Sequence, residues 1–239
     1  MVQAPQRTAV SGPTLVRLLT RIAQTEVAAP RQSLADRLSD WLGWTEAITL
    51  SSALSGGAGA AGARPVSAPA GNDAEAECER VRASLMRAIA VATRGPSAPT
   101  RRHAPPAEAP PDYADLRQRY QSMQQAMESD IGELRQRLRV MLAAATPGMA
   151  RLASVDAVME RSLGSRERSL LASVPTLLGA HFERLRDAQE QPDADQAPTA
   201  TASGAWMRTF LNDMQSVLRA ELEVRFQPVE GLLAALRTR

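Results

Sequence analysis

Hydrophobic residues recur every three or four positions along most of the chain, and no stretch alternates apolar and polar residues as a half-buried strand does. The longest run lies in 112–145. Its apolar stripe consists of Tyr113, Leu116, Tyr120, Met123, Met127, Ile131, Leu134, Leu138, Met141 and Ala145. These steps form a heptad seam with one four-residue stutter at Met127–Ile131, and they predict a helix about 50 Å long. We expect the seam to pack against another helix, from this chain or from another copy.

The same periodicity, broken by Pro-, Gly- and Ser-rich stretches, divides the rest of the chain. The predicted organisation is an N-terminal helical hairpin with a tryptophan pair (1–54), a flexible linker (55–72), a single helix (73–94), a Pro-rich linker (95–111), an antiparallel helical core (112–190), an acidic linker (191–203) and a C-terminal helix with a proline kink (204–239). The fold class predicted is all-α, an elongated antiparallel helical bundle or coiled-coil-like hairpin with flexible linkers.

Three prolines locate the main changes of direction. Pro147-Gly148 predicts a tight reversal after the long seam, and a short connection places the next helix antiparallel to it. Pro175 either kinks the returning segment or begins a new helix behind Ser173. Pro228 is expected to interrupt the C-terminal helix.

Composition limits the kind of core and the kind of partner. All 28 basic residues are arginine, and the net charge of +2 is spread evenly along the chain. Only 3% of residues are aromatic, so the core must be thin and filled by leucine and methionine. Cys78 is the single cysteine, which favours a reducing compartment and leaves the reactivity of its thiol open. No segment is apolar enough to span a membrane, and we expect a cytoplasmic protein.

No catalytic, cofactor or metal motif is present. The two histidines, His103 and His181, stand apart from any Cys/His cluster, and HExxH, Walker, GxGxxG and GxSxG patterns are absent. We therefore predict no catalytic residue, no cofactor and no metal ligand, and we do not expect an enzyme.

Nucleic-acid binding is the alternative, through Arg-rich helix faces. The densest run, Arg135-Gln-Arg137-Leu-Arg139, has acidic residues one to two turns away, and nucleic-acid binding needs an uninterrupted basic surface. The hairpin at 33–54 has the outline of a helix-turn-helix. Its second helix carries no Arg, Lys, Asn or Gln to reach base edges and phosphates, so we do not expect DNA recognition there.

The function favoured by these patterns is a non-enzymatic helical scaffold or adaptor that mediates protein–protein interaction, with a protein partner or self-association. Large side chains outside a deep core are typical anchors of such interfaces. The residues predicted to dock a partner are Trp41, Trp44, Met123, Met127, Trp206 and Phe210.

Three segments carry a resemblance: Trp41-Leu-Gly-Trp-Thr-Glu-Ala-Ile48, Arg166-Glu-Arg-Ser-Leu-Leu171 and Arg225-Phe-Gln-Pro-Val-Glu-Gly-Leu-Leu233. The chain resembles a proteobacterial domain-of-unknown-function family of Ala/Arg/Leu-rich helical proteins, over most of its length. The resemblance brings no activity and no catalytic residues. It implies a partner in an envelope-associated complex of the proton-channel-stator or peptidoglycan-binding type.

Overall fold

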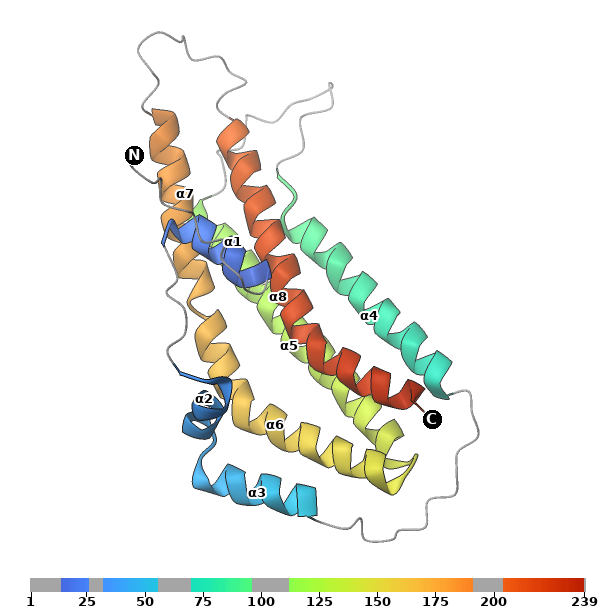
Figure 1. Ribbon diagram of the computed structural model, residues 1–239. Coiled ribbons are helices and arrows are strands. Elements are labelled where there is room, and N and C mark those ends of the chain that lie inside the picture. Colours follow the sequence, from blue (N-terminus) through green and yellow to red (C-terminus); the bar gives the residue numbers. More distant parts are fainter. Residues whose placement is uncertain (1–13, 26–31, 56–69, 96–111, 191–203, 239) are drawn as a thin grey trace, which may run out of the picture.

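The computed structural model describes residues 14–25, 32–55, 70–95, 112–190 and 204–238 (Figure 1). These residues form α-helices and connecting turns, with no strand among them. The helices are α1 (Thr14–Ala23), α2 (Leu34–Trp41), α3 (Trp44–Ser55), α4 (Ala70–Ala92), α5 (Tyr113–Ala143), α6 (Pro147–Leu171), α7 (Val174–Glu190) and α8 (Ala205–Arg237). The predicted all-helical, antiparallel fold is confirmed. Residues 1–13 and most of the predicted linker residues lie outside the described residues.

Two long helices, α5 and α8, form the centre of the molecule. They run side by side in the same direction, while α4 and the α6–α7 segment return in the opposite direction (Figure 1). α8 buries the larger number of side chains, which lie on a wide apolar face. The sequence analysis predicts an antiparallel helical core in 112–190. Within the described residues, the fully buried side chains come mostly from α5 and α8, with α4 packed against both, while α6 contributes few.

The predicted seam of α5 is buried over most of its length. The buried residues are Leu116, Tyr120, Met123, Met127, Ile131, Leu134, Leu138 and Leu142. At its C-terminal end the buried position is Leu142, while Met141 and Ala145 are only half-buried. The reason is that a straight helix repeats every 3.6 residues and drifts away from a strict heptad. Helices of the same chain cover the seam, so it needs no second copy.

The predicted turns occur at the expected prolines. Thr146 caps α6 by accepting a hydrogen bond from the Met149 amide at 3.2 Å, with Pro147 in the first turn. Pro175 begins α7 behind Ser173, which decides between the two alternatives for that residue. α8 continues through Pro228 as one helix, contrary to the expected interruption, and it changes direction in its C-terminal part (Figure 1). A proline removes one backbone hydrogen bond and bends a helix without necessarily ending it.

Short helices occupy the edge of the molecule. α1 crosses α7 and α8 and buries Leu15 and Ile22 against them, and the Arg184 guanidinium donates to the Ile22 carbonyl at its C-terminal end. α3 lies alongside α6, and α2 lies near the end of α6 that leads into α7 (Figure 1). The packing partner of α3 is α6.

Candidate functional site

The α2–α3 hairpin is held by local interactions at both of its turns. Ser33 and Asp36 form a capping box at the start of α2, with the Ser33 side chain accepting from the Asp36 amide at 3.1 Å. Gly43 separates the two helices. A side chain there would meet the Glu46 carboxylate, because an added Cβ would lie 2.4 Å from Glu46 Oε2. Glycine therefore lets Glu46 fold over the first turn of α3.

Trp41 and Trp44 have different environments although they are close in sequence. Trp41 is half-buried, with the guanidinium groups of Arg37 and Arg166 each 5.4 Å from its ring centroid. The cation–π contact with Arg166 joins α2 to α6, whereas Arg37 lies on α2 itself. Trp44 is 83% exposed. An exposed tryptophan becomes a candidate contact site for another molecule when further exposed apolar side chains lie beside it.

The face of α3 that carries Trp44 is directed away from the bundle. Leu50 and Ala53 are half-buried on the α6 side, whereas Trp44 and Ile48 lie on the opposite side, and Ile48 is 51% exposed. Ile48 follows Trp44 by four residues, so the two side chains are neighbours along one stripe. This outer face of α3 is the candidate interaction surface.

The other predicted docking residues lie mostly in the core. Met123, Met127 and Phe210 are buried, and Trp206 is half-buried with its ring centroid 5.1 Å from that of Phe182. Their apolar surface already packs against helices of the same chain. Met123, Met127 and Phe210 could reach a partner only if the bundle opened, and among the predicted residues Trp44 has the most exposed ring.

A buried polar cluster joins α5 to α8. Glu221 has no exposed surface, and its carboxylate accepts from the Tyr120 hydroxyl at 2.7 Å and from Gln124 Nε2 at 3.1 Å. Arg225 Nε donates to the same carboxylate at 3.0 Å, and Arg225 also pairs with Glu167 of α6 at 3.3 Å. Burial, and then the Glu221 carboxylate, raise the pKa of Tyr120. Because each group has a partner within the chain, the cluster fixes the helices relative to one another and leaves no group free for a substrate.

Sequence reasoning missed this cluster, although its signal is present. Glu221 and Arg225 are four residues apart and both fall on the apolar stripe of α8 that includes Val217 and Leu218. Two opposite charges at i and i+4 inside an apolar stripe indicate a buried ion pair.

The arginine run of α5 faces acidic side chains. Arg135 and Arg139 both contact Asp156 of α6, at 2.7 and 2.9 Å, and both contact Glu160 as well. Arg137 pairs with Glu77 of α4 at 2.6 Å. These guanidinium groups connect helices of the bundle, so the run gives no uninterrupted basic surface for phosphates.

His181 takes part in a contact between helices. Its Nε2 lies 2.9 Å from Asp213 of α8, which also pairs with Arg21 of α1 at 3.3 Å. Within the described ranges, no three His, Cys, Asp or Glu side chains form a group that could hold a metal ion. His103 lies outside the described residues.

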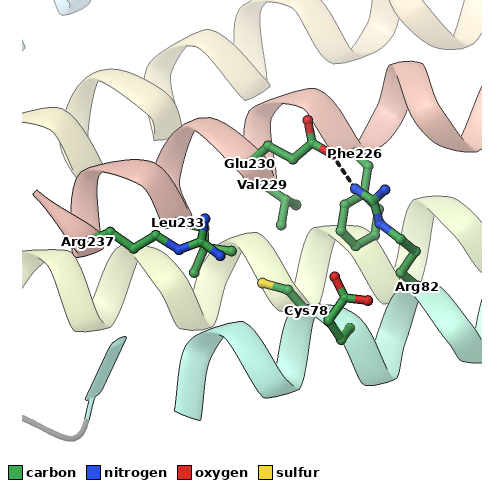
Figure 2. Close-up of a pocket in the computed structure, with 8 residues that line it drawn as sticks. Cys78, Arg82, Phe226, Val229, Glu230, Leu233 and Arg237 are labelled. Atoms are coloured by element: carbon green, nitrogen blue, oxygen red, sulfur yellow. Dashed lines mark hydrogen bonds and ion pairs between the residues drawn. The ribbon is translucent and has the colours of Figure 1, made fainter. Parts of the chain in front are cut away.

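Cys78 borders a pocket of about 360 Å³ between α4 and α8. Figure 2 shows Arg82 reaching from α4 to Glu230 of α8, with its guanidinium 4.5 Å from the centroid of the Phe226 ring. Burial raises the pKa of the Cys78 thiol, and the carboxylates of Glu77 and Glu79 raise it further. A thiol that stays protonated is a poor nucleophile and a poor metal ligand, so the pocket lacks a reactive group at this residue.

A second pocket, of about 380 Å³, lies where the start of α5 meets α7. Tyr113 covers Gly179 there, and its hydroxyl donates to the Pro175 carbonyl. None of the described helices has the length and apolar character that crossing a bilayer requires.

The comparison with known proteins places the chain in a family. Residues 1–238 match the family described as "Protein of unknown function (DUF3348)", and the chain belongs to this family. The resemblance to a domain-of-unknown-function family is thus confirmed over essentially the full sequence. No curated protein and no solved structure matches the chain. A function therefore has to be argued from the residues described above.

Proposed function

We propose that this member of the DUF3348 family is a non-enzymatic helical scaffold or adaptor that binds a protein partner through the outer face of α3. The observation that carries the proposal is the 83% exposure of Trp44 beside the half-exposed Ile48. Tryptophan is the residue most enriched among side chains that dominate binding energy, and it is effective when a partner excludes water from it. The rest of the bundle provides a rigid support for this face.

The polar side chains of the described residues support a structural role. Glu221, Arg225, Arg135 and Arg139 are engaged with one another or with acidic neighbours, and Cys78 keeps its proton. A catalytic site needs groups that are available to a substrate. We therefore propose an interaction function without chemistry, and the family resemblance adds an envelope-associated complex as its setting.

Affinity purification of the tagged full-length chain from its native host tests this function. We compare the wild-type chain with Trp44→Ala, and with Val91→Ala as a control for loss of an exposed apolar side chain on α4, where Val91 is 61% exposed. We expect a protein partner to be retained by the wild type and by Val91→Ala, and to be reduced about tenfold or more by Trp44→Ala, since a central anchor contributes about 2 kcal/mol or more.

Retention that does not depend on Trp44 would refute the proposal. If only nucleic acid were retained, and its retention fell steeply as salt rose, the alternative of an Arg-rich nucleic-acid-binding regulator would replace it.

A further inference from the structure

The outer face of α3 has a regular order of large and small side chains. Trp44, Ile48, Ser51 and Ser55 follow one another at steps of four, three and four residues, and all four are exposed. Such spacing forms one stripe along a helix. Along this stripe the large residues lie in the first half of the helix and the small residues in the second half, and Leu54, which is 54% exposed, lies on its flank.

We propose that the outer face of α3 binds a second copy of this chain, with the two α3 helices antiparallel across a two-fold axis. This inference rests on the proposed function, because it names the partner for the same surface. An interface on a two-fold axis uses the same patch on both copies, so the patch must be complementary to itself.

The order of residue sizes gives that self-complementarity only in the antiparallel arrangement. With the axis passing between Thr49 and Leu50, Trp44 lies opposite Ser55 of the second copy, and Ile48 lies opposite Ser51 of the second copy. Each large side chain then faces a small one, which lets the helices interdigitate. A parallel pair would instead place tryptophan against tryptophan and serine against serine.

Charge favours a second copy over a lipid surface or a nucleic acid. Glu46 is the only charged residue of α3, and it is half-buried towards the rest of the fold. Two such faces approach without repulsion between like charges. A lipid surface or a nucleic acid would need arginine to meet its phosphates, and α3 contains none.

Position and size indicate a weak dimer. α3 lies at the edge of the molecule with its outer face away from α6, so another copy can approach it (Figure 1). A single pair of helices of 12 residues buries about half of the area of a standard protein–protein interface. We therefore expect a dissociation constant between about 10 µM and 1 mM.

Sedimentation velocity of the full-length chain from about 10 to 500 µM measures this association. We expect the weight-average mass of the wild type to rise towards that of two copies. Trp44→Arg should remain a monomer throughout, because it removes the largest side chain and adds a charge. Val91→Arg adds the same charge on α4 and should behave as the wild type does. A wild type that stays monomeric, or a Trp44→Arg variant that still dimerises, would overturn the proposal.

Thiol cross-linking in a Cys78→Ala background tests the orientation. In the antiparallel pair the two Ser51 Cα atoms lie about 9 Å apart and the two Ser55 Cα atoms about 18 Å apart, so a bismaleimide with a spacer of about 8 Å should join Ser51→Cys chains only. Equal cross-linking of Ser51→Cys and Ser55→Cys chains would indicate a parallel pair and contradict the proposed arrangement.

These results separate the two proposals. A chain that is monomeric at 500 µM but retains a different protein through Trp44 would keep the adaptor function and remove the second copy as its partner. A chain that neither dimerises nor retains a protein through Trp44 would remove both.

Discussion

Glu221 and Arg225 show how much of this fold depends on single residues. Both lie inside an apolar helix face, and the pair is stable there because Tyr120, Gln124 and Glu167 complete its hydrogen bonds. Burying such a pair contributes little net free energy compared with apolar side chains, but breaking it leaves a charge without a partner. Because only one arrangement of the helices gives this pair all its partners, we expect the pair to fix how α5, α6 and α8 lie relative to one another.

Replacing one partner of this pair should be much more harmful than replacing both. We expect Glu221→Leu to lower the free energy of unfolding by about 3–5 kcal/mol, since the Arg225 guanidinium stays buried without its counter-charge. The double variant Glu221→Leu/Arg225→Leu should lose less than Glu221→Leu alone. Glu230→Leu, which breaks an exposed pair with Arg82, is the control and should change stability by about 1 kcal/mol or less.

Urea unfolding followed by circular dichroism measures these differences. A loss below about 1 kcal/mol for Glu221→Leu would show that the buried carboxylate does not hold the helices together.

Alkaline pH gives a second prediction at the scale of residues. The chain has no lysine, so its cysteine and its tyrosines are the side chains that lose protons at moderately alkaline pH. Burial raises the pKa of Cys78 above its ordinary value of 9.0 and those of Tyr113 and Tyr120 above 10.0. In the unfolded chain these groups lose their protons at the ordinary values, while the folded chain still holds them. The stability that these raised pKa values contribute is therefore fully present below pH 9.0. The free energy of unfolding should fall as pH rises above that value.

Tyr120 should contribute a fall of about 1.4 kcal/mol per pH unit above its ordinary pKa, for as long as the folded chain keeps its proton. Tyr120→Phe removes one such group, so its free energy of unfolding should fall less steeply between pH 10 and 11 than that of the wild type. The hydrogen bond to Glu221 is lost as well, so this variant should be less stable at neutral pH. An equal alkaline slope in both proteins would contradict a raised pKa at Tyr120.

At the scale of the elements, two helical glycines have opposite roles. Gly132 lies in the middle of α5 with no atom within 4 Å of an added Cβ, whereas a Cβ on Gly179 of α7 would lie 2.8 Å from the Tyr113 ring. Alanine favours a helix over glycine by about 1 kcal/mol. At Gly179 that gain competes with displacement of the ring that anchors the start of α5.

We expect Gly132→Ala to raise the free energy of unfolding by about 0.5–1 kcal/mol, and Gly179→Ala to lower it by about 1–3 kcal/mol. Thermal unfolding of the two variants beside the wild type measures the signs. If Gly179→Ala also stabilised the chain, the packing of Tyr113 on α7 would be looser than its geometry indicates.

α3 marks the boundary of what periodicity can predict. Its apolar residues, among them Trp44, Ile48 and Leu50, lie on both faces, so no single stripe indicates which face is buried. The neighbouring α2 and the long α5 each concentrate their apolar residues on one side. The helices themselves were therefore predictable, but the exposure of Trp44 depends on how α3 packs on α6, and that contact is between segments far apart in sequence.

At the scale of the whole molecule, the sequence predicted the fold class, the antiparallel return after Pro147 and the helical character of each described segment. It did not predict that α8 shares the centre with α5. Periodicity indicates which face of a helix is apolar, but it does not say which helices pack against each other. The same reason explains why Met123, Met127 and Phe210 were predicted as docking residues: a large apolar side chain looks alike in sequence whether it fills a core or an interface.

In the whole-molecule account, the described helices of one chain cover the seam of α5, and the outer face of α3 with Trp44 and Ile48 is left exposed. The most direct test follows Trp44 itself. The chain has three tryptophans, so Trp41→Phe/Trp206→Phe leaves Trp44 as the only indole. Its fluorescence and its quenching by iodide are measured as protein concentration rises. We predict solvent-exposed emission in dilute solution, shifting to shorter wavelength with weaker quenching as a second copy covers the ring. Emission and quenching that stay those of an exposed indole at every concentration would contradict the account.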